Sequence, residues 1–231
     1  MLSRSDVRRL DFGTFTRPAA ETGTDRARLV PVVGYLVRHP EGLLLFDTGV
    51  GEDAETDEYY RIIRRPLPAV LEAAGVSRAE VTLVVNCHLH FDHCGGNPLL
   101  AGTPIITQSG ELAAAGQVQN YTLPSLIDFA GANYQQIDGE QEILPGVWVI
   151  PTPGHTDGHQ SLVLRCGDGT LILAGQSHET AADYTFDSLA DRADREGRTD
   201  LPPYPAWMRR LQDFDPARVL FAHDLSVWEP A

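Results

Sequence analysis

Residues 86–97 read NCHLHFDHCGGN and directly follow a short β-branched run at 81–85. Within six positions of this stretch lie His88, His90, Asp92 and His93. If the chain stays extended after a buried strand, His88 and His90 share one face, and a turn then directs the next two side chains towards a neighbouring point. Neutral imidazoles and a carboxylate suit a borderline cation such as Zn²⁺. The stretch therefore predicts a metal centre at the end of a strand.

The residues that surround these candidate ligands have structural explanations. Gly95 and Gly96 permit a close backbone turn at which a helix can begin. Cys87 and Cys94 flank the histidines, and in an alternating strand the Cys87 side chain points away from His88. We interpret both cysteines as small buried residues.

Two later histidines lie in similar contexts. His155 follows a predicted strand at 148–151, and His223 follows a predicted strand at 218–222. Loops at strand ends are where a rigid scaffold usually presents ligands, so both residues are candidates for the same centre. Ligands need hydrogen-bond partners, a role that we expect for Asp47. His159 is expected either to have the same role or to be a core histidine, and not to be a ligand.

Elsewhere the chain alternates predicted strands and helices. Residues 29–49 form two strand-like runs around a turn at 39–42, which predicts a hairpin, and Gly75 ends a predicted helix at 67–74. Two mixed sheets packed face to face, with helices outside, satisfy this pattern in a single domain spanning residues 1–231. Further strands are predicted at 81–85, 104–107, 148–151, 161–165, 170–174 and 218–222, and further helices at 110–117, 185–197 and 204–214.

Charge and hydropathy narrow the range of partners. The chain has 18 basic and 32 acidic residues, a formal net charge of −14, which disfavours nucleic acid as a partner. No run approaches the roughly 20 apolar residues of a membrane helix, and no apolar signal-peptide segment follows the first arginines. We expect a soluble cytoplasmic protein that acts on a small molecule. Its cleft is expected to be lined by Tyr121, Leu123 and Phe129.

The segments HLHFDH at 88–93, TPGHTDGHQS at 152–161 and FAHD at 221–224, with the DTG turn at 47–49, resemble the metallo-β-lactamase superfamily. They look most like its N-acyl-homoserine lactonase branch. The resemblance implies an αβ/βα sandwich with one or two zinc ions per chain. By position, the first ion would be held by His88, His90 and His155, and the second by Asp92, His93 and His223.

The chemistry that the resemblance implies is hydrolysis of a small-molecule lactone or ester. A hydroxide held by the metals attacks the carbonyl carbon, and Asp92 passes a proton to the leaving alkoxide. Two alternatives remain open, namely a thioester hydrolase of the glyoxalase II type and a degenerate, non-catalytic metal-binding protein. The glyoxalase type usually carries a C-terminal helical extension, whereas this chain ends eight residues after His223.

One position departs from the family pattern. Gln176 stands where the family usually has an aspartate that bridges the two metals. A neutral amide compensates less positive charge, so we expect the second site to be weaker or completed by another group. His178 and Glu179 are candidates for metal or substrate binding. Glu179 falls where the lactonase branch commonly has a tyrosine that contacts the substrate carbonyl.

Overall fold

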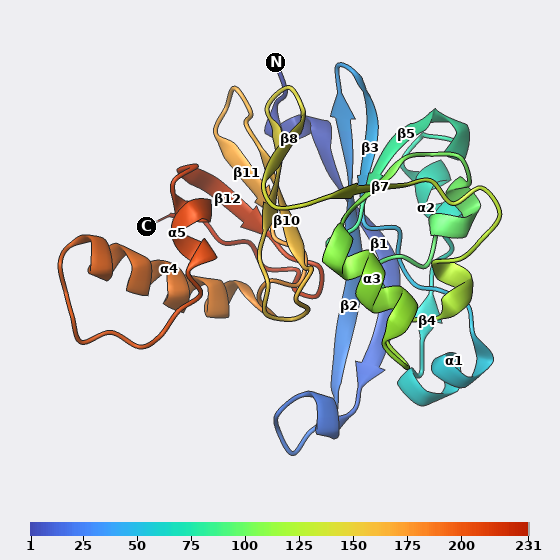
Figure 1. The fold of residues 1–231 in the computed structure, drawn as a ribbon, viewed down its shortest axis with the longest axis horizontal. Helices are drawn as coiled ribbons and strands as arrows, with labels where there is room; N and C mark the ends of the chain where they lie inside the picture. The colour runs from blue at the N-terminus through green and yellow to red at the C-terminus, as the bar shows by residue number, and fades with distance from the viewer. Residues whose placement is uncertain (231) are drawn as a thin grey trace.

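Two β-sheets lie face to face in the computed structural model, which describes residues 1–230, and helices cover the outer face of each (Figure 1). The larger sheet has seven strands in the order β4-β1-β2-β3-β5-β6-β7. The smaller has five strands in the order β12-β11-β10-β9-β8. Parallel and antiparallel neighbours occur in both, because β3, β5, β6 and β7 pair parallel, as do β11 and β12, and the remaining pairs are antiparallel.

The strands of the larger sheet are β1 (Val7–Arg17), β2 (Arg28–His39), β3 (Gly42–Phe46), β4 (Ile63–Arg64), β5 (Val81–Val85), β6 (Ile105–Gln108) and β7 (Tyr134–Ile137). Those of the smaller sheet are β8 (Gln141–Leu144), β9 (Val147–Pro151), β10 (Gln160–Leu164), β11 (Thr170–Leu173) and β12 (Pro216–Leu220). The α-helices are α1 (Ala54–Tyr60), α2 (Leu67–Ala73), α3 (Ser109–Gln117), α4 (Ala181–Arg195) and α5 (Trp207–Gln212). Short 3₁₀ helices are η1 (Arg4–Asp6), η2 (Ala19–Glu21), η3 (Arg78–Glu80), η4 (Asn97–Leu100) and η5 (Pro124–Leu126).

The two faces of β2 show how the layers are held together. Side chains alternate across a strand. Val33 and Tyr35 accordingly join the apolar core between the two sheets, whereas Val32 and Leu36 join the core beneath α2. A third core, which includes Ile172, fills the space between the smaller sheet and the helices α4 and α5. These three cores confirm the predicted sandwich of two mixed sheets flanked by helices.

The hairpin at 29–49, the helix that ends before Gly75 and the strand at 81–85 are confirmed. Strand β1 was not predicted, because Arg8, Arg9 and Asp11 interrupt its apolar pattern, although it pairs on both sides with β2 and β4. The short strands β4, β7 and β8 were not predicted either.

Several predicted boundaries in the C-terminal part were wrong. Helix α4 begins at Ala181 and not at residue 185, because the Thr180 side chain caps it by accepting a hydrogen bond from the Asp183 backbone N–H. Helix α5 is shorter than the predicted 204–214, and β12 ends at Leu220. His223 therefore lies in a loop, three residues beyond the strand. No helix within residues 1–230 is long and apolar enough to cross a membrane.

Gly95 fixes the loop that follows β5 against the loop that follows β3. Its backbone N–H donates to the Gly49 carbonyl at 2.8 Å, and a Cβ atom at this position would lie 1.9 Å from the Gly51 nitrogen. The two loops therefore approach each other more closely than any side chain would allow.

We expect Gly95→Ala to lower the free energy of unfolding by about 1–3 kcal/mol, because the backbone of 49–51 must move away. Gly110→Ala is the matched control, since a Cβ atom at this helical position meets nothing within 4 Å. Urea unfolding of both variants measures the effect. Equal midpoints would show that the loops tolerate the added methyl group.

Candidate metal centre

Four loops that follow strands converge at one edge of the sandwich. They follow β5, β9, β11 and β12 and carry the residues predicted from sequence. The ligand atoms of the six predicted residues form two groups, and within each group the atoms lie within 4.8 Å of one another. The first group comprises His88, His90 and His155, and the second comprises Asp92, His93 and His223.

The first group consists of three imidazoles. His90 Nδ1 lies 3.0 Å from His88 Nε2 and 3.1 Å from His155 Nε2. With Zn–N bonds of about 2.0–2.1 Å, nitrogens around a tetrahedral ion lie about 3.3 Å apart, close to these separations. Desolvation by the packed side chains lowers the pKa of His90 to about 4 and that of His155, the most exposed of the three, to about 3, and burial holds the pKa of His88 well below its usual range. All three rings are therefore neutral near pH 7, as ligation requires.

The second group combines two imidazoles with a carboxylate. The Nε2 atoms of His93 and His223 are 3.2 Å apart, and Asp92 Oδ2 lies 3.4 and 3.3 Å from them, respectively. Burial would raise the pKa of Asp92, but His93 and His223 outweigh it and hold that pKa well below the usual range. Asp92 is therefore an anionic oxygen donor. Burial opposes a charge on His93, yet Cys87, Asp92 and Asp47 outweigh it and raise the pKa of His93.

Hydrogen bonds on the far side of each ring fix the orientation of the second group. Asp47 Oδ2 lies 3.0 Å from His93 Nδ1, and His223 Nδ1 donates to the Pro31 carbonyl at 2.8 Å. Such partners leave Nε2 of each ring free to face a cation. The donor set and its supporting contacts thus fit a metal centre.

Cys87 differs from its predicted orientation. Its sulfur lies 3.1 Å from both His88 Nδ1 and Asp47 Oδ2 and 3.3 Å from His93 Nδ1, so the prediction that it points away from His88 was wrong. The prediction assumed that side chains alternate along a strand as far as Cys87, but β5 ends at Val85. The cysteine is buried as expected, and burial raises the pKa of its thiol, which favours a hydrogen-bonding group over a thiolate ligand.

His159 and Gln176 lie side by side behind the two groups. The backbone N–H of Gln176 donates to His159 Nε2 at 3.0 Å, and His159 Nδ1 lies 2.8 Å from Thr152 Oγ1. The Gln176 side chain is 3% exposed, and its Oε1 atom lies 3.2 Å from His223 Nε2. This amide oxygen therefore borders the second group.

His178 and Glu179 have different surroundings. His178 Nε2 lies 3.1 Å from Asp187 Oδ2, and the ring packs edge-on against Tyr184 and Trp207, so the structure does not bring it to the two groups. Glu179 accepts hydrogen bonds from Gln176 and from Arg17. Burial would raise the pKa of Glu179, but the bond from Gln176 and the charge of Arg17 outweigh it and lower that pKa.

Glu111, a fully buried carboxylate in α3, was not predicted from the sequence. It accepts hydrogen bonds from the Leu89 backbone N–H and the Thr156 hydroxyl, both at 2.8 Å, and from the Tyr121 hydroxyl at 2.5 Å. It thus connects three loops around the histidines. A glutamate in the first turn of a helix is common, and no local pattern marks this one as buried.

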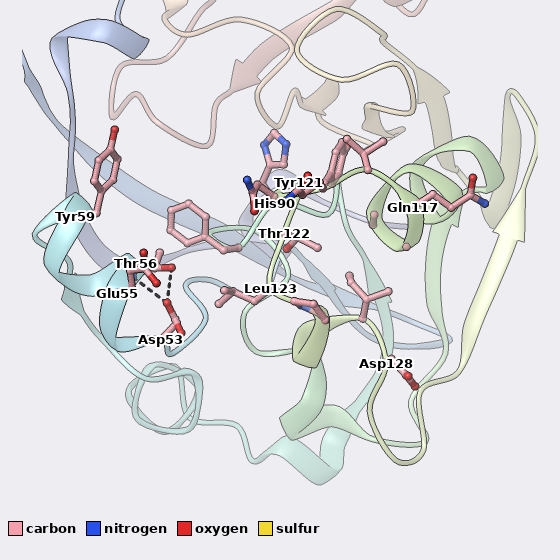
Figure 2. A pocket seen from close by; sticks show the side chains of 18 of the residues that line it. Asp53, Glu55, Thr56, Tyr59, His90, Gln117, Tyr121, Thr122, Leu123 and Asp128 are labelled. Atoms are coloured by element: carbon pink, nitrogen blue, oxygen red, sulfur yellow. Dashed lines mark hydrogen bonds between the residues drawn. The ribbon is translucent and has the colours of Figure 1, made fainter.

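A pocket of about 990 Å³ borders the first group at His90 (Figure 2). Tyr59 on α1 lies on one side, and Tyr121 and Gln117 lie on the other, at the end of α3. The Tyr121 ring centroid is 4.8 Å from that of His90. Tyr121 and Leu123 line the pocket as predicted, whereas Phe129 packs against the core beneath the larger sheet.

Known proteins share both the sequence and the fold. The sequence profile of the metallo-beta-lactamase superfamily matches residues 27–223. An N-acyl homoserine lactonase from Bacillus cereus is 31% identical over 212 residues, covering 85% of this chain and 82% of the relative. A second, from Rhizobium radiobacter, is 26% identical and covers 86% and 84%, respectively.

A solved N-acyl homoserine lactone hydrolase, with N-hexanoyl-L-homoserine bound at its catalytic metal center, superposes with a TM-score of 0.76 at 24% identity. The match covers 97% of this chain and 94% of that one. At this identity the likeness concerns the fold.

We expect the purified protein to carry between one and two zinc-like ions per chain. His88→Ala combined with His90→Ala removes two of the three donors of the first group and should abolish binding there. Elemental analysis measures the metal content, with His39→Ala as the control, because His39 is the last residue of β2 and belongs to neither group. A folded wild-type chain that takes up no metal after incubation with zinc would exclude a metal centre.

Proposed function

The chain belongs to the metallo-β-lactamase superfamily, and on that premise we propose that it is a zinc-dependent hydrolase that opens a small-molecule lactone. The observation that carries the proposal is the convergence of two three-residue groups of metal-ligand type beside an open pocket. We further propose that residues 1–231 act as one domain and hold one to two ions. Imidazole nitrogens and one carboxylate favour zinc over magnesium or calcium, which prefer oxygen ligands.

The two groups define which residues would hold the ions. His88, His90 and His155 would hold one ion, and Asp92, His93 and His223 the other, with the Gln176 oxygen beside the second. Bound divalent cations supply Lewis acidity and make a water nucleophilic at neutral pH.

Asp92 is the chain's own candidate for moving a proton. Its carboxylate is buried in the second group, 3.4 Å from His93 Nε2 and 3.3 Å from His223 Nε2, and is held in the ionised form. An ionised carboxylate can accept a proton from the attacking water and deliver it to the alkoxide that leaves when the lactone ring opens. We propose this role for Asp92 in addition to ligation.

The pocket beside His90 suits a substrate with an apolar extension. Tyr60, Phe91, Leu123 and Ile127 contribute apolar surface, and the Tyr121 ring packs against His90, with 4.8 Å between the ring centroids. An acyl chain on the lactone can occupy this surface while the carbonyl group faces the histidines. The relatives that match most of the chain are N-acyl homoserine lactonases, which supports a substrate of this class. They give no support to a glyoxalase II-type thioesterase or to a degenerate binding protein.

We expect the zinc-loaded protein to hydrolyse an N-acyl homoserine lactone faster than an aryl ester or an S-acyl glutathione thioester, and a chelator to abolish the activity. Asp92→Asn should lower kcat/KM by about 10²–10⁴, because it removes an anionic donor and a proton carrier. Asp168→Asn, the same change at an exposed turn, is the control. Wild-type turnover by Asp92→Asn would rule out the assigned role, and a preference for the thioester would favour the glyoxalase type.

A further inference from the structure

Three polar side chains form a chain that runs outward from His223. The Gln176 Oε1 atom lies 3.2 Å from His223 Nε2, and the Gln176 amide nitrogen donates to Glu179 Oε1 at 2.9 Å. The second carboxylate oxygen, Glu179 Oε2, accepts from Arg17 Nη1 at 2.6 Å. Each end of the amide and each oxygen of the carboxylate thus has its own partner.

The contact with Glu179 determines which end of the Gln176 amide faces the second group. A carboxylate accepts hydrogen bonds and cannot donate them when ionised, so it selects the NH₂ end. The carbonyl oxygen is therefore left facing His223. The reverse orientation would bring two oxygens together at Glu179 and would direct an N–H towards a cation. In the metal-free chain, Glu179 is thus the contact that selects the orientation in which the oxygen faces the second group.

Arg17 in turn holds Glu179. The Arg17 side chain is 13% exposed and packs over the Phe15 ring, with its guanidinium carbon 5.9 Å from the ring centroid. Phe15 also contacts the His223 ring edge-on, at 5.7 Å between centroids. Because β1 supplies both Phe15 and Arg17, a single strand of the larger sheet supports His223 and the carboxylate that orients its neighbour.

We propose that Glu179 is a positioning residue of the second metal site, which acts through Gln176. The glutamate aims the neutral amide oxygen at the cation, and Arg17 keeps the carboxylate in position. Asp92 and the amide oxygen of Gln176 are then the oxygen ligands of this site, and Glu179 is not a ligand. The inference rests on the metal centre proposed above, not on which lactone or ester is hydrolysed.

The test is a Co²⁺ titration of metal-free protein, followed by visible absorption of the bound ion and by calorimetry. Wild type should show two binding steps. Glu179→Ala should weaken the second step by about 10–100-fold, as removal of a ligand's hydrogen-bond partner typically does, and leave the first step unchanged. Glu21→Gln is the matched control, because Glu21 lines the same small cavity beside His223 but does not contact Gln176.

A double-mutant cycle separates action through Gln176 from direct ligation. If Glu179 acts through the amide, then Glu179→Ala should have no further effect on the second step in a Gln176→Leu background. Additive losses would overturn the proposal, because they would mean that the carboxylate acts on the cation independently. An unchanged second step in Glu179→Ala, a loss of the same size in Glu21→Gln, or a single step in wild type would also overturn it.

Two further measurements keep the outcome unambiguous. Thermal unfolding of the metal-free variants shows whether the loop from Gly175 to Thr180 remains folded. Glu179→Gln keeps the shape of the side chain and an acceptor oxygen, so it should give a smaller loss than Glu179→Ala and replaces it if the alanine variant does not fold. Lactone turnover is not a readout here, so a chain that hydrolyses no lactone can still show the expected cycle.

Discussion

The candidate ligands are packed here with their nitrogen and oxygen atoms 3.0–3.4 Å apart. In the first group a single atom, His90 Nδ1, faces a nitrogen of both His88 and His155, so one proton or one lone pair has to serve two contacts. A cation at the centre of each group would accept these lone pairs, together with the Asp92 carboxylate in the second group. The rest of the site follows from it, because the outer nitrogens of the rings must then be held by Asp47, by the Pro31 carbonyl and by similar acceptors.

How much of this could be predicted from sequence depends on how local each signal is. The dense motif at 88–93 and the hairpin at 29–49 carry their information within a few residues, so the fold class and the two groups of candidate ligands were accessible. The role of Glu111 could not be predicted, because it arises only when α3 packs against the loops that contain Leu89 and Thr156. Strand β1 was missed for a similar reason, since pairing on both sides makes it a strand despite its charged residues.

The orientation of Cys87 and the surroundings of Gln176 illustrate the same limit at the scale of single side chains. Strand alternation predicts direction only while the strand lasts, and β5 ends two residues before Cys87. The absence of an aspartate at position 176 was visible in the sequence. The contacts of the Gln176 side chain could not be predicted from the sequence. Arg17 is 159 residues away from Gln176 along the chain and is linked to it only through Glu179.

The metal groups also join parts of the chain that fold as different layers. His90 comes from a loop of the larger sheet and His155 from a loop of the smaller one, and the same is true of His93 and His223. A bound ion therefore acts as a crosslink across the sandwich, and its binding energy adds to the stability of the folded chain. Metal starvation would then affect more than catalysis. In a cell short of the metal that these groups would hold, the population of unfolded chains would rise and proteolysis would remove them, so the amount of this protein would follow the supply of that metal.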